Sequence, residues 1–187
     1  MKELLVILAP FAGAIAALAW PREGTRRRLL PVVGAAHAVL TGWLLVDPPA
    51  AVEGSWIGFD AVSRAVLPAV SLLFLVCSFY GLSYLRLRPE RGNRIFVASL
   101  CGLLGLLSLS LQAQHLGLLW VSVEAATLST VPLLHFNRTG RAVEAAWKYL
   151  LIGGTGIALS LLGSFCLGYA SLVGTGRGDL TFAALGR

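Results

Sequence analysis

Charged residues are scarce in this sequence, and no polar segment is long enough to form a soluble domain. Only 13% of the 187 residues are charged, whereas 57% are hydrophobic. Runs of about 18 or more mostly apolar residues recur along the whole chain, which is the pattern of transmembrane helices. The composition therefore excludes an ordinary soluble domain. It predicts an all-α fold, a polytopic bundle of membrane helices.

Motifs that bind cofactors or metals are missing as well. Cys77, Cys101 and Cys166 are isolated within apolar runs, with no CxxC and no Cys/His spacing. We expect them to be small buried residues rather than disulfide partners or metal ligands. The sequence also has no nucleotide-binding loop, no cluster of metal ligands and no nucleophile–base pair. We therefore expect no cofactor, no metal and no redox centre on this chain.

The net charge of +6 would suggest a nucleic-acid partner for a soluble protein. Here the arginines lie in short loops between apolar runs, so we expect no nucleic-acid partner. The N-terminal segment resembles a signal peptide, but its basic cluster follows the apolar run and further runs come after it. We therefore expect a retained first helix.

Six membrane spans are predicted, in a single integral membrane domain over residues 1–187. Their expected ranges are Leu4–Trp20, Leu29–Val46, Ala61–Leu85, Ile95–Leu111, Leu116–His135 and Trp147–Leu172. Because every connection is short, neighbouring spans must alternate in direction. Asp60 precedes the third span and is its expected N-cap.

Basic residues mark every second connection. The loops after the first, third and fifth spans carry them, whereas "DPPAAVEGSWIGFD" and the short "QAQH" contain no Lys or Arg. The basic residues are Arg22, Arg26, Arg27, Arg28, Arg86, Arg88, Arg91, Arg94, Arg138 and Arg141. Since basic loops remain on the cytoplasmic side, this pattern predicts an N-terminus on the outer side.

Small residues recur every four positions in the sixth span. Gly156, Ser160, Ser164 and Gly168 form one stripe, and Ser122 with Ala126 repeats the pattern in the fifth span. Such stripes let helix backbones approach closely in lipid. We expect both spans to pack against protein as well as lipid, and we interpret the stripes as structural.

Glu124 is the strongest candidate for a functional residue. It lies near the middle of the apolar stretch "GLLWVSVEAATLSTVPLL", which contains no basic residue. A charged side chain at the bilayer centre costs at least roughly 2.5–3.5 kcal/mol, so this carboxyl should face protein or water. A carboxyl group that is removed from water can gain and lose a proton near neutral pH, which suits a proton relay. The alternative is a structural carboxyl that hydrogen-bonds to a neighbouring helix.

Lys148 is a secondary candidate, in the first turns of the sixth span. It can reach the membrane interface and pair with Glu144, four residues earlier, or it can act as a relay group near Glu124. Imidazole titrates near neutral pH, so the histidines are possible relays too. His115 and His135 bracket the fifth span and His37 lies in the second. We interpret them first as boundary residues.

Two segments resemble the antiporter-like membrane subunits of respiratory complex I and its relatives. They are "LGLLWVSVEAATLSTVPLL" and "FNRTGRAVEAAWKYLLIGGTGIALSLLGSFCLGYA", and the greatest likeness is to the F component of hydrogenase-4 and formate hydrogenlyase complexes. The upstream "GFDAVSRAVLPAV" resembles the segment that enters the third helix of that family. The resemblance covers most of the chain and is strongest from about Gly117 to Ala170.

The resemblance implies a fold of about fourteen spans with two inverted five-helix repeats, each containing a broken helix. It implies that Glu124 corresponds to a glutamate of the fifth helix, which is paired with a lysine on the broken seventh helix. It also implies a location in the bacterial plasma membrane, with other membrane subunits and a peripheral redox module as partners. This sequence ends after the sixth span, so the broken helix and its lysine are not part of it.

The function expected from these observations is that of a proton-translocating membrane subunit, or the N-terminal part of one. Its complex would be a complex I-like NADH:quinone oxidoreductase or a membrane-bound hydrogenase. One alternative is a non-catalytic membrane scaffold or assembly fragment. Another is a subunit of a cation/proton antiporter, because such subunits share the fold.

Overall fold

The computed structural model shows an all-helical protein and describes residues 2–50, 52, 54–87, 92–137, 139–175, 178 and 180–185. Six of its helices are long and apolar enough to cross a membrane. They are α1 (Lys2–Ala19), α2 (Glu23–Val46), α3 (Ala61–Arg86), α4 (Arg94–Gln112), α5 (Leu116–Leu134) and α6 (Gly140–Thr175). A short 3-10 helix, His135–Asn137, follows α5, and a short helix α7, Phe182–Leu185, follows α6. The predicted fold class and the six predicted spans are confirmed.

Two helices begin earlier than their apolar stretches predict. Helix α2 starts at Glu23 rather than Leu29, and α6 starts at Gly140 rather than Trp147. The added turns hold arginine, alanine and glutamate, which favour helix although they are not all apolar. Arg26 therefore lies inside α2 instead of in the preceding loop. Arg88, Arg91 and Arg138, which contributed to the predicted orientation, lie outside the described residues.

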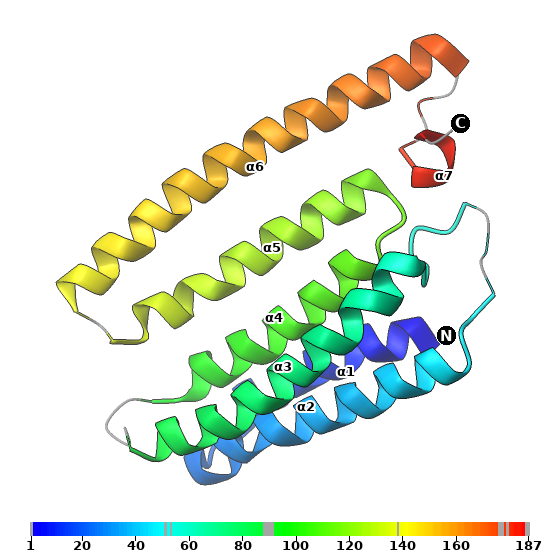
Figure 1. Ribbon diagram of the computed structural model, residues 1–187. Coiled ribbons are helices and arrows are strands. Elements are labelled where there is room, and N and C mark those ends of the chain that lie inside the picture. The colour runs from blue at the N-terminus through cyan, green and yellow to red at the C-terminus, as the bar shows by residue number, and fades with distance from the viewer. Residues whose placement is uncertain are drawn as a thin grey trace.

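The helices alternate in direction, and most of the extensive contacts join helices that follow one another along the chain. Helices α1 to α4 form a four-helix bundle in which α1 packs most extensively against α4. Helix α5 packs on α4, and α6 packs on α5 at the edge of the molecule, as Figure 1 shows. The end that holds the connections α1–α2, α3–α4 and α5–α6 is called the basic end below. The opposite end holds the N-terminus, Asp60 and His115, and is called the N-terminal end.

Small residues permit close contacts in the four-helix bundle. A methyl group on Gly105 of α4 would lie 2.9 Å from the Phe11 ring of α1. The main apolar cluster joins all four helices and consists of Ala17, Leu30, Val33, Leu85, Val97, Ala98, Cys101 and Leu104. Cys101 is thus buried as predicted, but Cys77 and Cys166 are exposed on the helix surfaces that the membrane would cover, so their predicted burial is wrong.

The Arg26 side chain links three helices at the basic end of the bundle. This side chain is only 5% exposed, although it carries a guanidinium group. Nη2 and Nε donate to the Trp20 backbone oxygen at 2.5 and 3.1 Å, and Nη1 donates to Asn93 Oδ1 at 2.9 Å. Asn93 in turn donates to the Glu23 backbone oxygen at 3.2 Å. One side chain therefore ties together the end of α1 and the starts of α2 and α4.

Three backbone segments pair at the N-terminal end. Residues 56–58, which precede α3, bond to the α4–α5 connection, and that connection bonds to residues 180–182. The four bonds are Gly58 N to Gln112 O (2.8 Å), Gln114 N to Trp56 O (2.8 Å), Leu116 N to Leu180 O (2.9 Å) and Phe182 N to Gln114 O (3.0 Å). This pairing fixes the far end of α6 relative to the bundle.

Asp60 is the N-cap of α3, as predicted. Its Oδ1 accepts hydrogen bonds from the Ser63 backbone N–H at 2.8 Å and from the Ser63 hydroxyl at 2.7 Å. Burial alone would raise the pKa of this carboxyl, but the hydrogen bonds from Ser63, the Gln114 side chain and the Asp60 backbone together outweigh burial, so the pKa of Asp60 lies below its ordinary value. The ionised form is therefore the one that caps the helix.

Replacing Asp60 should make this contribution visible as a dependence of stability on pH. Asp60→Ala should lower the free energy of unfolding by about 1 kcal/mol at neutral pH, because the cap is lost. Asp60→Asn should retain a cap that does not titrate. Since the folded-state pKa is lowered, the charged cap stabilises above the unfolded-state pKa of about 3.9 and its contribution is lost as the pH falls below it. Thermal unfolding in detergent between pH 3 and 7 measures this pH dependence. The same pH dependence in the wild type and in Asp60→Asn would contradict the prediction.

Candidate functional site

Helix α5 carries Glu124 and is bounded at both ends by histidine. It begins after His115, whose Nδ1 accepts a hydrogen bond from the Gly117 backbone N–H at 3.1 Å. It ends at His135, the C-cap residue. Ser122 and Ala126 are its buried residues, and they mark the side that faces the bundle. The predicted small-residue pair of the fifth span is therefore in contact with protein.

Glu124 lies on the opposite side of α5. Residues two apart are separated by about 200° around a helix, so Glu124 points away from the face of Ser122 and Ala126. Its side chain is nevertheless partly buried, and Oε2 is enclosed by protein. No residue in the described part of the chain donates a hydrogen bond to this oxygen. A buried polar atom normally has a partner, so the site is chemically incomplete without a further donor.

The neighbours of Glu124 on α5 do not supply that donor. The Thr127 hydroxyl, the nearby hydroxyl group, donates to the Val123 backbone oxygen at 3.0 Å. Trp120, one turn before Glu124, directs its indole N–H to the Ile157 backbone oxygen of α6 at 3.0 Å. Val121 and Leu128, on the other side of Glu124, are 53% and 49% exposed. Glu124 therefore lies at the margin of the α5–α6 contact, next to an open apolar surface.

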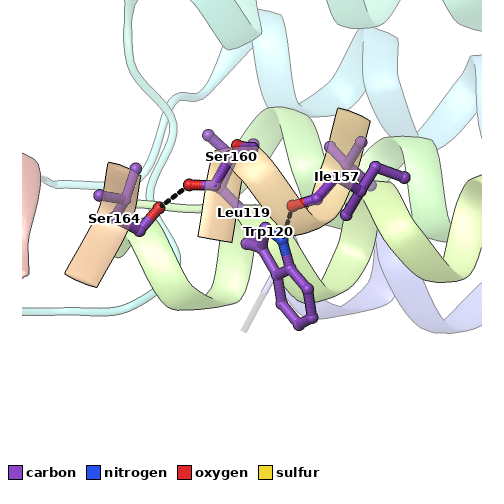
Figure 2. Close-up of a pocket in the computed structure, with 7 residues that line it drawn as sticks. Leu119, Trp120, Ile157, Ser160 and Ser164 are labelled. Atoms are coloured by element: carbon purple, nitrogen blue, oxygen red, sulfur yellow. Dashed lines mark hydrogen bonds between the residues drawn. The ribbon is translucent and has the colours of Figure 1, made fainter. Parts of the chain in front are cut away.

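A cavity of about 170 Å³ lies between α5 and α6 beside Trp120. Figure 2 shows Trp120 bonded to Ile157 on one side of it, and the Ser164 hydroxyl donating to the Ser160 backbone oxygen at 2.9 Å on the other. The cavity is lined by Leu116, Leu119, Trp120, Val123, Ile157, Ser160 and Ser164. Within the predicted stripe of α6, Ser164 is buried, whereas Gly156 has no side chain or other helix within 4 Å of where its Cβ would be. A Cβ on Gly168 would lie 3.1 Å from the Leu180 side chain, whereas Ser160 is exposed. Gly156 and Ser160 are thus the part of the stripe that the described residues leave uncovered.

Lys148 forms an ion pair with Glu144, as one of its two interpretations predicts. The Nζ–Oε1 distance is 2.5 Å, and the two side chains are 69% and 63% exposed. Lys148 lies eight residues into α6, about 12 Å along the helix from Gly140. The structure therefore places it on the surface near the basic end.

The two histidines that bracket α5 lie far from Glu124 along the helix. His115 and His135 are nine and eleven residues away, about 13 and 16 Å. His115 also stacks on Trp56, with ring centroids 4.5 Å apart. His135 is exposed. In the described parts of the chain, no hydrogen bond or ion pair joins Lys148 or either histidine to Glu124.

The predicted position of His37, at a membrane boundary, is wrong. His37 is completely buried in the middle of α2, between Ser71 of α3 and Ser108 of α4. It is therefore not a boundary residue. The signal was available in the sequence, because His37 lies eight or nine residues from either end of its predicted span, where ionisable side chains are rare.

Metal binding has no support in the side-chain arrangement. Over the ranges that the structure describes, no group of three or more His, Cys, Asp or Glu side chains could hold a metal ion.

Comparisons with known proteins identify relatives in respiratory membrane complexes. No family model matches the chain. It is 34% identical over 125 residues to the hydrogenase-4 component F homolog of Methylacidiphilum infernorum, an alignment that covers 64% of this chain and 25% of that protein. It is also 30% identical over 105 residues to NADH-quinone oxidoreductase subunit N of Thioalkalivibrio sulfidiphilus, over 56% of this chain and 22% of that protein. This chain is a multi-pass membrane protein related to such subunits. The predicted family resemblance is thus confirmed as partial homology.

The fold has a counterpart in a solved structure. A chain of the membrane-bound sulfane sulfur reductase, an archaeal respiratory membrane complex, superposes with a TM-score of 0.82 over 99% of this chain. The sequence identity is 18%, so this likeness supports the fold alone. The present chain corresponds to 39% of that chain and to about a quarter of the two curated relatives.

Proposed function

We propose that this chain is a proton-translocating membrane subunit, or part of one, in a complex I-like NADH:quinone oxidoreductase or a membrane-bound hydrogenase complex. The observation that carries the proposal is Glu124, a carboxyl group in the middle of α5 with one enclosed oxygen and no donor from the described residues. The relatives are named as hydrogenase and NADH-quinone oxidoreductase components, which supports this setting.

A carboxyl group in an apolar site is suited to taking up and releasing a proton. A carboxylate in an apolar site is costly, and protonation removes the charge and turns the group into a hydrogen-bond donor. A carboxyl group that is intermittently charged can therefore receive a proton from one side and release it to another. Because Glu124 faces away from the α1–α4 bundle, the proton partner approaches from the side of α5 that carries Val121 and Leu128.

The partner that would complete the site is a basic or hydroxyl-bearing side chain from a helix outside the described residues. The exposed side chains of Val121 and Leu128, with the uncovered Gly156 of α6, offer a surface against which such a helix can pack. A lysine there would stabilise the charged form of Glu124 when close and favour its protonation when it moves away. The family resemblance implies a lysine of this kind.

Lys148, His115 and His135 are assigned secondary roles in the proposal. Lys148 would tune the charge near the basic end, where its exposed ammonium group already pairs with Glu144. The histidines at the two ends of α5 would exchange protons with the aqueous phases. No residue of this chain is proposed to hold a redox cofactor, so electrons would be handled by other subunits and a peripheral redox module.

The proposal includes the orientation in a bacterial plasma membrane. Arg22, Arg86, Arg94 and Arg141 all lie at the basic end, which supports its placement on the cytoplasmic side. Lys2 and Arg64 are exceptions at the N-terminal end; Lys2 forms an ion pair with Asp47, and Arg64 lies over the Phe59 ring. The N-terminus would then lie on the outer side.

Proton uptake by vesicles that contain the assembled complex tests the proposal. Glu124→Gln should abolish uptake driven by the redox reaction while the subunit remains assembled. Unchanged uptake would favour a scaffold, which needs the helices but not the carboxyl group. Uptake that requires Na⁺ or another cation, with no redox partner, would favour a cation/proton antiporter instead.

A further inference from the structure

Four buried polar side chains form a continuous hydrogen-bonded chain inside the α1–α4 bundle. His37 of α2 lies at its centre, with Nδ1 2.8 Å from the Ser71 hydroxyl of α3 and Nε2 2.8 Å from the Ser108 hydroxyl of α4. Thr41 extends the chain, because its hydroxyl is 3.0 Å from that of Ser71. All four side chains are at most 2% exposed. Both nitrogens of a completely buried imidazole are thus paired with hydroxyl groups from two other helices.

Because both ring nitrogens pair with hydroxyl groups, the ring proton can lie on either nitrogen. The Ser71 hydroxyl is also 2.9 Å from the Leu67 backbone oxygen, and the Ser108 hydroxyl is 2.8 Å from the Leu104 backbone oxygen. Each serine can therefore donate to its carbonyl and accept from the ring, or donate to the ring instead. Rotation of two hydroxyl groups accommodates a proton on Nδ1, on Nε2 or on both, with no ring nitrogen left unpaired. A fixed backbone donor or acceptor would permit only one of these states.

Among the described residues of the helices packed around α2, no charged group faces the ring. The buried residues of α1 are apolar, apart from glycine, and those of α3 contribute only serine hydroxyl groups. On the buried face of α4 the single titratable group is the Cys101 thiol. Arg26, on α2 itself, is eleven residues away, about 16 Å along the helix. A neutral ring is therefore the resting form, and a second proton is held only transiently.

Beyond Ser108, polar groups of α4 continue towards the N-terminal end of the bundle. Gln112, the last residue of α4, donates from Nε2 to the Ser108 backbone oxygen at 3.2 Å. Gln112 is 0% exposed, and its Oε1 accepts no hydrogen bond from any described residue. A buried acceptor normally has a donor, which a water molecule would supply here. Towards the basic end, Leu104 and the main apolar cluster separate His37 from Arg26.

We propose that His37, Ser71 and Ser108 form a proton-exchange site within the α1–α4 bundle, which communicates with the aqueous phase at the N-terminal end past Gln112. In the exchange, hydronium delivers a proton to the unprotonated ring nitrogen through the adjacent serine hydroxyl and leaves as water. Release of the proton from the other nitrogen to water restores the neutral ring. This site uses neither Glu124 nor the α5–α6 pair, so it stands independently of the function proposed above.

Nuclear magnetic resonance of the full chain in lipid bilayers, with ¹⁵N-labelled histidine, tests the proposal directly. The signals of His37 are assigned as those that disappear from the spectrum of the His37→Gln variant. Ser71→Ala removes the partner of Nδ1, so the ring proton should move to Nε2 and bond to Ser108. Ser108→Ala should move it to Nδ1. Because an unpaired buried N–H is costly, each variant should change the ratio of the two tautomers by about tenfold or more, in opposite directions.

Ser78→Ala is the matched control. Ser78 is also a buried serine of α3, but its hydroxyl donates only to the Leu75 backbone oxygen among the described residues, at 2.6 Å. This variant should leave the His37 signals unchanged. A ring proton that stays on the same nitrogen in both the Ser71 and Ser108 variants would mean that the serines do not control its position, and that result would overturn the proposal.

Exchange with solvent provides a second measurement that needs no altered serine. In the wild type, the ring N–H of His37 should exchange in D₂O without unfolding, and Gln112→Leu should slow that exchange by about tenfold or more because the polar connection is lost. A ring N–H that exchanges only when the helix backbone exchanges would overturn the proposal, whatever the variants show.

Discussion

Redox-driven proton uptake should fall at least about tenfold in Glu124→Gln, because glutamine keeps the shape of the side chain but cannot gain and release a proton. The change is small in volume and leaves the contact between Trp120 and Ile157 in place. We expect the subunit to assemble normally, so the loss would be in transport. The measurement is proton uptake per electron transferred, in vesicles that contain the complete complex.

Further variants separate proton transfer from a structural role of Glu124. A glutamate that only donates or accepts one hydrogen bond would be replaced well by glutamine, whose amide does both. Glu124→Asp keeps the titrating group and should retain part of the uptake. Glu3→Gln is a matched control. Glu3 lies in the first turn of α1, at the N-terminal end, so its carboxyl group is outside the proposed path. Equal uptake by Glu124→Gln and Glu3→Gln would contradict a transport role for Glu124.

The positions of the helices along the chain could be predicted because apolar length is a local property. Each span needs about 20 mostly apolar residues, and the sequence shows this directly. The starts of α2 and α6 were missed because their first turns contain charged residues that favour helix without being apolar. The ends defined by Asp60 and His135 were predicted to within one residue, since caps and boundary residues also act locally.

Lateral contacts between helices could not be predicted in the same way. The buried face of α5 follows from the small residues Ser122 and Ala126, but nothing in the sequence identifies α4 as the helix they face. His37, Ser71 and Ser108 are separated by more than thirty residues along the chain, and only the folded bundle brings them together. The depth of Glu124 in its apolar span predicts proton chemistry, and this stays a prediction. The isolation of Glu124 from Lys148 required the structure.

Arg26→Met should be strongly destabilising, because the buried guanidinium group of Arg26 donates hydrogen bonds to Trp20 and Asn93. Methionine retains most of the apolar length of the side chain, so the loss isolates the guanidinium hydrogen bonds. Asn93 Oδ1 would lose its donor in a buried environment, and the part-buried Trp20 backbone oxygen would lose both of its donors from Arg26. We expect the free energy of unfolding to fall by roughly 2–3 kcal/mol.

Arg28→Met is the matched control for this prediction. Arg28 lies two residues further along α2 but is exposed, so its replacement removes the same charge without leaving a buried acceptor unpaired. Thermal unfolding in detergent should therefore show a large decrease for Arg26→Met and little change for Arg28→Met. Equal effects would mean that the charge at the basic end matters rather than the buried contacts. The bundle would then be closed by its apolar cluster alone, and α1, α2 and α4 would not depend on one arginine for their relative positions.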